Sequence, residues 1–405
     1  MLQFQVPDDR NYYIYKQYGN NPMAPLGPIG IIPLTGSQAF TKQVNDFLFK
    51  RRTEYREISP HDEEIYPGFM RQDYRISVEN IRFSSGEGKA MINSTVRGHD
   101  IFIISDITNF SCTYKMFGLT NHMSPDDHYQ DLKRVILAIS GKARRINVIM
   151  PFLYESRQHK RSSRESLDCA HMLEELYELG VKNIITFDAH DERVANAIPT
   201  GGFENIPSTY QLIKSLINTT PDLDISGGKL MVVSPDEGAI SRAMYFASML
   251  GVPLGTFYKR RDYTQIVNGR NPIVAHEFLG ESVEGLDLLI IDDMISSGDS
   301  MLDLARELKG RKANRIFSAV TFGLFTDGLE HFDQAYEEGL FDRVFATNLI
   351  YRRPELLKAP WFTDVNMAKF VALLVDAINH DASLSALVDP TEKIRKLLER
   401  VRKNG

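Results

Sequence analysis

The sequence predicts an α/β protein made of two tandem domains, each with a parallel sheet flanked by helices. Three observations predict this fold. Short apolar runs typical of buried strands alternate with amphipathic helical segments, the order that gives parallel sheets covered on both faces. The alternation breaks near residues 200–215, where prolines and glycines gather, and then returns. A chain of 405 residues also exceeds the usual length of one domain.

The first domain is expected over residues 29–205, after an irregular extension of residues 1–28 rich in Tyr, Asn, Pro and Gly. Residues 51–75 are polar, and we expect them to form an irregular connection or insertion. Gly180 is expected to end the last helix of this half. The expected elements, in chain order, are strand 29–34, helix 37–50, strand 100–105, helix 129–140, strand 145–151, helix 166–179 and strand 181–188.

The second domain is expected over residues 206–360, and residues 361–405 are expected to form helices that partly complete the domains. Asp389 and Pro390 indicate the cap and first turn of a basic terminal helix. The expected elements are strand 229–236, helix 238–250, strand 286–291, helix 301–308, strand 315–321 and helix 366–378.

Composition and charge exclude several classes of protein. The formal net charge is −6, without the basic surplus typical of proteins that bind nucleic acid. The only cysteines are Cys112 and Cys169, so we expect neither a disulfide framework nor a cysteine-based metal site. The start lacks the pattern of a secretory signal, and no apolar run is long enough to cross a bilayer. We therefore expect a soluble cytoplasmic protein that binds neither nucleic acid nor membrane.

The segment Leu286–Ser300 is the most informative part of the chain. An apolar strand leads to Asp292 and Asp293, a turn of Ser, Ser, Gly, Asp and Ser follows, and a helix comes next. The backbone amides of such a turn, at a helix N-terminus, favour an anion. Carboxylates beside them can accept hydrogen bonds from sugar hydroxyls. The segment therefore predicts a site for a sugar phosphate, and a purely structural turn rarely combines these features.

Two other expected strands also end in carboxylates, Asp188 and Asp236, and ligands of open parallel sheets bind beyond such strand ends. Residues 188–191 include His190 between carboxylates, which can ligate a divalent ion or contact a phosphate. Taken alone, they are more typical of a polar loop with a helix cap. Asp236 can hold Mg²⁺ or serve as an N-cap.

Three further segments have both a functional and an ordinary structural explanation. The cations of residues 259–261 can neutralise a polyphosphate or form a solvated loop. Residues 157–161 offer a phosphate-binding guanidinium and an amide for a base edge, or form a solvated turn. Residues 83–87 can stack an aromatic ring on a purine, or form a bulged hairpin turn.

Taken together and in order, these segments resemble the ribose-phosphate pyrophosphokinase (phosphoribosyl pyrophosphate synthetase) family over residues 29–390. The resemblance implies two type I phosphoribosyltransferase domains. It also implies an Mg²⁺-dependent reaction of ATP with ribose 5-phosphate that gives phosphoribosyl pyrophosphate and AMP. The segments that carry it are Phe83–Glu87, Val96–Asp100, Ser156–Gln158, Thr186–His190, Val233–Asp236, Lys259–Arg261, Ile291–Ser300 and Ala382–Leu387.

On the nucleotide side, the resemblance implies that His190 contacts the Mg²⁺-bound phosphates of ATP, and that Arg157 and Gln158 bind ATP. Adenine is framed by three residues from a neighbouring subunit, so a homo-oligomer is implied. These residues are Phe83, Ser85 and Glu87.

On the sugar side, the resemblance implies that Asp236 holds Mg²⁺ and that Asp292 and Asp293 bind the ribose hydroxyls. Lys259 and Arg261 are implied as catalytic cations on a mobile loop that stabilise the transferring pyrophosphoryl group. The 5-phosphate is implied to lie against Ser296, Ser297, Gly298, Asp299 and Ser300.

The chain departs from the family pattern at several positions. Ser296, Ser297 and Asp299 stand where the family usually has other residues in the sugar-phosphate loop, and Asp299 adds a carboxylate near a phosphate. His159 stands where the family usually has Asp, and Ser166 where it usually has Pro. Residues 51–75 and both terminal extensions are additions.

Two other functions remain open from the sequence. The first is a non-catalytic regulatory subunit related to the synthetases, which the intact Lys259 and Arg261 disfavour. The second is a phosphoribosyltransferase, which the sugar-phosphate loop alone fits equally well, but which the tandem domain and the segment at Phe83 disfavour. Release of AMP rather than pyrophosphate separates the synthetase from the transferase. A DNA-binding regulator is disfavoured because no helix-turn-helix with a basic face is evident.

Overall fold

The computed structural model describes residues 24–58, 68–161, 163–225, 228–261 and 273–404. The chain divides into two compact units. Unit 1 comprises the chain through Ile206 together with Met367–Pro390, and unit 2 comprises Pro207–Asn366 together with the chain from Thr391. No helix in the described ranges is long and apolar enough to span a membrane.

Unit 1 is built on a five-stranded parallel sheet with the order β1-β4-β7-β8-β9. Its central strands consist of apolar, largely β-branched residues buried on both faces, the composition of a parallel sheet covered by helices. The strands are β1 (Ile29–Pro33), β4 (Asp100–Ile104), β7 (Arg145–Ile149), β8 (Asn183–Phe187) and β9 (Gly202–Ile206).

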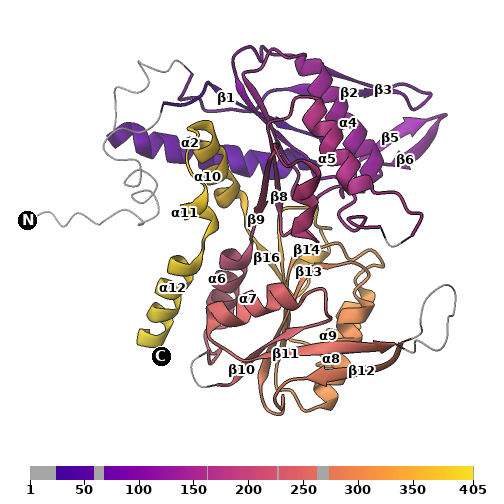
Figure 1. Ribbon diagram of the computed structural model, residues 1–405, viewed down its shortest axis with the longest axis vertical. Coiled ribbons are helices and arrows are strands. Elements are labelled where there is room, and N and C mark those ends of the chain that lie inside the picture. Colours follow the sequence, from indigo (N-terminus) through magenta and orange to yellow (C-terminus); the bar gives the residue numbers. More distant parts are fainter. Residues whose placement is uncertain (1–23, 59–67, 162, 226–227, 262–272, 405) are drawn as a thin grey trace, which may run out of the picture. The chain divides into compact units, whose positions relative to one another are not determined.

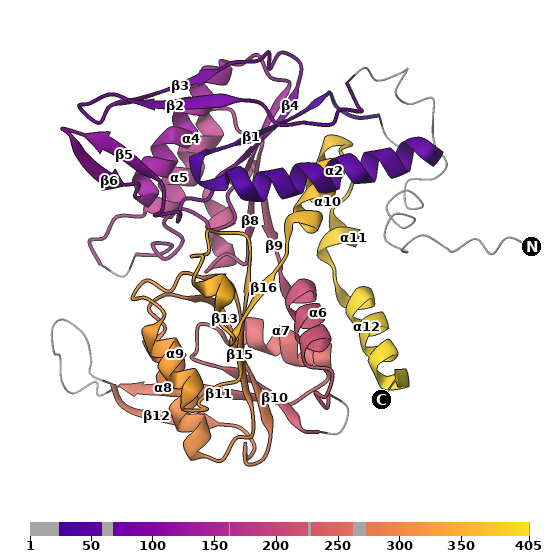
Figure 2. The same ribbon diagram turned by 180° about the vertical axis from the view of Figure 1, so that it is seen from behind.

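Helices cover both faces of this sheet, as Figures 1 and 2 show. On one face lie α4 (Pro125–Ile139), which begins at a capping box formed by Ser124 and Asp127, and α5 (Asp168–Glu178). On the other face α2 (Gln38–Ile58) packs against α10 (Ala368–Asn379). The shorter helical segments are η1 (Thr35–Ser37), η2 (Glu192–Ala197) and α11 (Ser385–Val388).

The expectation that residues 51–75 are irregular is wrong for residues 51–58, because α2 continues to Ile58. The side chains of Arg51 and Arg52 are buried in this last part of the helix, and both pair with Asp376 of α10. Polar residues thus pack inside the unit, which a polarity pattern read from sequence cannot indicate. Residues 59–67 lie outside the described residues.

Two antiparallel hairpins extend side by side from unit 1 (Figure 2). One is formed by β2 (Val78–Arg82) and β3 (Gly88–Ile92), and the other by β5 (Thr113–Met116) and β6 (Leu119–His122). A hydrogen bond of 2.8 Å from the Phe117 amide to the Ser84 carbonyl joins their tips. The expected elements did not include these strands, because they are short and partly exposed.

Unit 2 contains a seven-stranded sheet with the order β12-β11-β10-β13-β14-β15-β16. It is mixed rather than purely parallel, because β12 runs antiparallel to β11 at one edge. The strands are β10 (Leu230–Ser234), β11 (Leu254–Arg261), β12 (Ile273–Leu279), β13 (Asp287–Ile295), β14 (Ile316–Gly323), β15 (Arg343–Thr347) and β16 (Phe362–Val365).

The core of unit 2 has two layers, one on each face of the sheet. Alternate residues of β10 show this, since Leu230 and Val232 belong to one cluster while Met231 and Val233 belong to the other. The first cluster is covered by α6 (Thr209–Thr219), α7 (Ile240–Leu250) and α12 (Thr391–Asn404). The second is covered by α8 (Asp299–Gly310) and α9 (Glu330–Glu337), and η3 (Leu356–Lys358) lies before β16.

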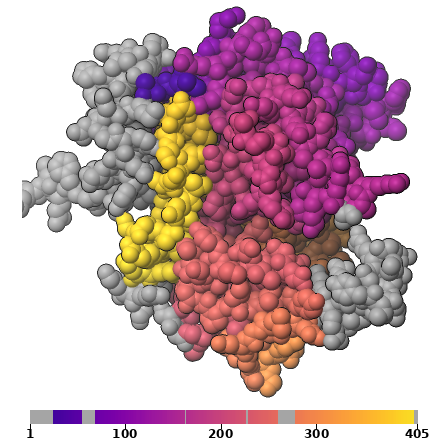
Figure 3. Space-filling view, viewed as in Figure 1, coloured from indigo at the N-terminus to yellow at the C-terminus, as the bar shows by residue number. Residues whose placement is uncertain are grey.

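The C-terminal helix α12 belongs to unit 2, although the segment before it belongs to unit 1. Ile394 and Leu398 of α12 are buried in the cluster beneath α6 and α7, and the helix itself lies at the surface (Figure 3). The polar outer side and buried apolar side of α12 explain why this basic segment folds as a helix here.

Candidate active site

The acidic pair Asp292–Asp293 lies inside β13, close to its carboxyl end. The strand was expected to end at Ile291, but it continues to Ile295 because β14 is long enough to pair with it through Gly323. Neighbouring residues of a strand face opposite sides of the sheet. Asp293 is buried, Asp292 is partly exposed, and the amide of Asp293 donates to Oδ1 of Asp292 over 2.8 Å.

The electrostatic surroundings of this pair suit a cation. Burial, and then the neighbouring charges of Asp293 and Asp236, together raise the pKa of Asp292 to about 8. Three carboxylates of unit 2 therefore act on one another. Mg²⁺ prefers oxygen ligands, so the chemical type of these side chains, though not a complete set of ligands, suits that ion.

The loop that follows, residues 296–300, turns sharply into α8. Gly298 has φ +99°, and its carbonyl accepts the first hydrogen bonds of the helix, from the amides of Met301 and Leu302 at 3.0 Å each. Gly298 is buried against the ring of Phe332 in α9. The backbone amide of Thr326 donates to the Ser296 carbonyl over 3.0 Å, which attaches the loop to the segment after β14. The turn and the start of α8 thus have the backbone geometry of a loop before a helix N-terminus, and the anion site there stays a prediction.

Asp299 is the first residue of α8, and its side chain is exposed. Nδ1 of His331 lies 3.8 Å from Oδ1 of Asp299. His331 was not among the predicted site residues. Only the packing of α9 beside the loop brings His331 near Asp299, and no pattern in the sequence indicates this contact.

Asp236 follows β10 in the turn before α7. Its Oδ1 accepts hydrogen bonds from the amides of Gly238, at 2.9 Å, and Ala239, at 3.2 Å. These bonds close a turn ahead of the helix. The N-cap role given as the structural alternative for Asp236 is wrong, because the N-cap of α7 is Ala239 and no side chain caps this helix.

Lys259 and Arg261 belong to β11 and pair with β12 through His276 and Ile273. The sequence interpretation placed them on a loop, and that is wrong for their backbone, because a second strand pairs with the segment. Their side chains and residues 262–272 lie outside the described part of the chain.

In unit 1, residues 83–87 form the turn of the β2–β3 hairpin, the structural alternative given for this segment. Phe83 is about half exposed (48%), and Oγ of Ser85 donates to Oε2 of Glu87 over 2.8 Å. Gly86 has φ +95°, which lets the turn close. The turn thus presents an aromatic face beside a hydrogen-bonded hydroxyl and carboxylate, a combination able to contact a purine.

Arg157 and Gln158 lie in the segment after β7, and His190 lies in the segment after β8. Because β7 and β8 are parallel neighbours, these segments emerge at the same edge of the sheet. The side-chain Nε2 of Gln158 donates to the Ser166 carbonyl over 2.8 Å, while Arg157 and His190 are exposed. The ring of His159 lies against that of His190.

Among the residues that the structure describes, no group of three or more His, Cys, Asp or Glu side chains has the arrangement of a metal site. Cys112 and Cys169 are free thiols, and burial raises the pKa of each, to about 11 and about 12.

Comparison with known proteins was made on sequence and on structure. Residues 31–180 match the N-terminal domain of ribose phosphate pyrophosphokinase, and residues 200–338 match the phosphoribosyl transferase domain. The ribose-phosphate pyrophosphokinase of Shewanella oneidensis is 27% identical over 310 residues, which cover 76% of this chain and 89% of the relative. The one from Vibrio parahaemolyticus is 28% identical, with the same coverage of both chains.

Among solved structures, phosphoribosylpyrophosphate synthetase from Mycobacterium smegmatis matches with a TM-score of 0.67 at 19% identity. The match covers 88% of this chain and 100% of that one. The predicted fold of two phosphoribosyltransferase-type domains is therefore confirmed.

Proposed function

The chain belongs to the ribose-phosphate pyrophosphokinase family, and from this we propose that it transfers the pyrophosphoryl group of ATP to ribose 5-phosphate. The products are phosphoribosyl pyrophosphate and AMP. The observation that carries the proposal within the structure is the acidic pair of β13 followed by the amide-lined turn into α8.

In this reaction the hydroxyl on C1 of the sugar attacks the β-phosphorus of ATP. A bond forms between that oxygen and phosphorus, the bond from the β-phosphorus to the oxygen bridging it to the α-phosphate breaks, and the hydroxyl loses its proton. The protein forms no covalent intermediate, so its contribution is to position two polyanions and to offset their charge.

We assign the sugar to unit 2. Asp292 and Asp293 accept hydrogen bonds from the ribose hydroxyls, and residues 296–300 bind the 5-phosphate through backbone amides and serine hydroxyls. Support for this comes from Gly298, whose positive φ turns the loop at the start of α8.

We assign the nucleotide mainly to residues of unit 1. Phe83 stacks on adenine, while Ser85 and Glu87 bind its edge, which is consistent with their hydrogen-bonded arrangement in the hairpin turn. Arg157 and Gln158 bind the nucleotide from the segment after β7. An adenine site shared between neighbouring subunits requires a homo-oligomer, which multi-angle light scattering of the purified protein measures directly.

Asp236 and His190 are the residues that we propose for holding Mg²⁺. The ion supplies positive charge that offsets the phosphates of ATP. The charges of Asp293 and Asp236, which raise the pKa of Asp292, support a requirement for a cation there. We also propose that the protein works in the cytoplasm, where its two thiols stay reduced.

The direct test is an assay that detects AMP formed from ATP, ribose 5-phosphate and Mg²⁺ by the purified protein. AMP and phosphoribosyl pyrophosphate in equal amounts are expected. No AMP would reject the proposal and favour the regulatory subunit, whereas pyrophosphate released from phosphoribosyl pyrophosphate and a base would favour the transferase.

Lys259→Ala tests the catalytic cations, because a charge that acts on the transferring group affects the transition state more than the bound substrates. We expect kcat to fall by about 100-fold or more while both KM values change little. Lys312→Ala is the control, since Lys312 forms only an exposed ion pair with Glu284. A large rise in KM without loss of kcat would assign Lys259 to binding instead.

A further inference from the structure

His159 and His190 come from different segments but lie against each other in unit 1. They follow the parallel neighbours β7 and β8, and their ring centroids are 5.3 Å apart with an interplanar angle of 61°. An edge-to-face contact of this kind fixes the relative orientation of two rings. The orientation of His190 is thus coupled to that of His159.

His159 is itself held from the other side. Its Nε2 lies 3.4 Å from Oδ2 of Asp191, and its side chain is only 11% exposed. Asp191 is fixed in turn, because its Oδ1 accepts the backbone amide and Nε of Arg193, each at 2.9 Å. Oδ2 of Asp191 also accepts hydrogen bonds from Nε and Nη2 of Arg193, so both oxygens of this carboxylate are held in place.

The two histidines differ in exposure. His190 is exposed. His159 is nearly buried, and its Nδ1 has no hydrogen-bond partner among the described residues. A buried nitrogen without a partner disfavours folding, so packing alone gives no reason for a histidine rather than an apolar ring at this position.

We propose that His159 is a positioning residue for His190: Asp191 fixes the ring of His159, and this ring holds the His190 imidazole in the orientation that meets the phosphates of ATP. The inference rests on the proposed function of His190. It assigns no contact between His159 and substrate.

The proposal makes the effect of His159 depend on His190. His159→Asn removes the ring that orients His190. We expect KM for ATP to rise by about tenfold, which is typical when a residue that orients a binding side chain is lost. KM for ribose 5-phosphate should stay within about twofold of the wild-type value, because the residues proposed to bind this sugar belong to unit 2. Asp191→Asn keeps both rings but loosens His159, and it should raise KM for ATP in the same direction.

The decisive comparison is a double-mutant cycle. If His159 acts only through His190, the double variant His159→Asn/His190→Asn binds ATP no more weakly than His190→Asn alone. A further tenfold loss in the double variant would overturn the proposal, because His159 would then act on ATP independently. An unchanged KM in His159→Asn would overturn it as well.

Calorimetric titration with MgATP gives a second measurement that does not depend on turnover. If the wild-type chain binds MgATP but forms no AMP, the proposed function fails while the cycle of binding constants still decides the role of His159. His171→Asn is the matched control, since His171 is an exposed histidine of α5 in the same unit. Should His159→Asn fail to fold, His159→Gln and Asp191→Asn provide the same comparison.

Discussion

At the scale of single residues, the sugar-phosphate loop depends on Gly298. Its φ of +99° disfavours any residue with a Cβ atom, and a Cβ built there would lie 2.2 Å from Cε2 of Phe332. A larger residue at position 298 would therefore have a strained backbone and would clash with Phe332. This ring belongs to an aromatic cluster with Phe325 and Trp361.

We predict that Gly298→Ala lowers the free energy of unfolding by about 2–4 kcal/mol, from roughly 1 kcal/mol of backbone strain and the rest from overpacking. KM for ribose 5-phosphate should rise because the anion site is displaced. Urea unfolding and steady-state kinetics measure the two effects.

Gly251→Ala is the control for that substitution. Gly251 also has a positive φ, of +72°, but no atom lies within 4 Å of the Cβ that would be added. We expect it to cost only the backbone part, about 1 kcal/mol. Equal losses in the two variants would show that contact with Phe332 is unimportant.

A second prediction concerns the pH dependence contributed by Asp292. Its pKa of about 8 in the folded protein lies above its ordinary value of 3.8, mainly through burial. The folded state therefore keeps a proton that the unfolded state releases, and stability falls as pH rises from about 4 to 8 and levels above this range.

Asp292→Asn should flatten this part of the stability curve. Urea midpoints of the ligand-free protein, recorded across that pH range, measure the difference. A wild type and variant with parallel curves would contradict the assignment.

The residue scale also shows why only part of the site was predictable. The predicted sugar site lies within one short segment, residues 292–300. The order of strand, acidic pair, turn and helix was therefore visible in the sequence. The contacts of His331 with Asp299 and of Phe332 with Gly298 were not, because α9 is brought to the loop by the fold. The buried Arg51 and Arg52 resembled surface residues for the same reason.

At the scale of elements, the β2–β3 hairpin is attached to α4 by Arg82. Its Nη1 donates to Asp131, whose carboxylate also accepts from Arg134 at 2.7 Å. The side chains of Arg82 and Asp131 are buried, at 9% and 4% exposure, and the guanidinium lies 5.1 Å from the ring centroid of Tyr114 in β5. One buried cation thus links both hairpins to the helix.

We predict that Arg82→Ala destabilises unit 1 by about 3 kcal/mol, because removing one partner leaves Asp131 buried with less compensation. Hydrogen exchange of residues 78–92 should become faster, and KM for ATP should rise while KM for ribose 5-phosphate does not. Arg75→Ala is the control, since its ion pair with Asp73 is much more exposed, at 32% and 50%, and solvent-exposed pairs contribute about 0–1 kcal/mol. Similar exchange in both variants would argue against this attachment.

Elements with a strong apolar pattern were predicted close to their actual bounds, for example β10 and α7. A hairpin turn at residues 83–87 was one of two alternatives, but the strands of both hairpins were not predicted because they bury few residues. The strand β12 was missed because an antiparallel edge strand does not follow the βα alternation. The sequence shows burial through periodicity, and an element with little buried surface gives little signal.

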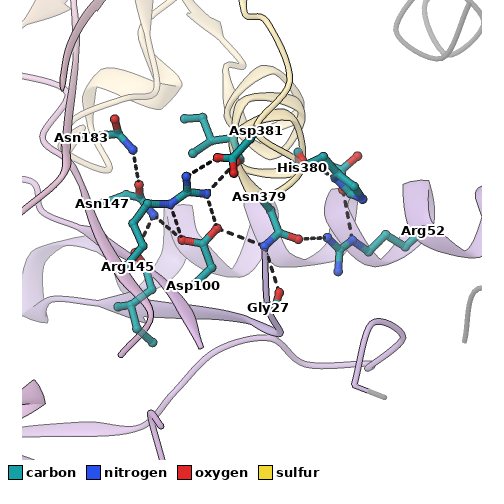
Figure 4. Close-up of polar contacts among 12 residues, drawn as sticks. Gly27, Arg52, Asp100, Arg145, Asn147, Asn183, Asn379, His380 and Asp381 are labelled. Carbon is teal, nitrogen blue, oxygen red and sulfur yellow. Dashed lines mark hydrogen bonds and ion pairs between the residues drawn. The ribbon is translucent and has the colours of Figure 1, made fainter. Parts of the chain in front are cut away.

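At the scale of the whole molecule, the chain passes between the two units three times, after Ile206, after Asn366 and after Pro390. Unit 1 is consequently incomplete without Met367–Pro390. Asn379, at the end of α10, joins this segment to the sheet, since its Nδ2 donates to the Gly27 carbonyl and to Asp100, at 3.0 Å each (Figure 4). It also accepts from Nη2 of Arg52 at 2.8 Å.

Asp376 is the charged centre of this attachment. Burial would raise its pKa, but the charges of Arg51, His380 and Arg52 outweigh burial and hold the pKa below its usual range. A carboxylate with a lowered pKa contributes stability above its unfolded pKa, near pH 4, and this contribution is lost as pH falls further. The contribution of Asp376 to the stability of unit 1 should therefore decrease as the pH falls below about 4.

We predict that Asp376→Asn destabilises unit 1 by about 3–5 kcal/mol, because two buried guanidinium groups lose their counter-charge. The helices α2 and α10 belong to unit 1, so their backbone amides should exchange faster with solvent. The amides of α6 and α7, which belong to unit 2, should keep their protection. Asp381→Asn is the control: its carboxylate also pairs with an arginine, Arg145, but is half exposed, so its loss should cost about 1 kcal/mol or less. Equal loss of protection in both units after Asp376→Asn would mean that they unfold as one body, and that this network stabilises the whole chain rather than unit 1.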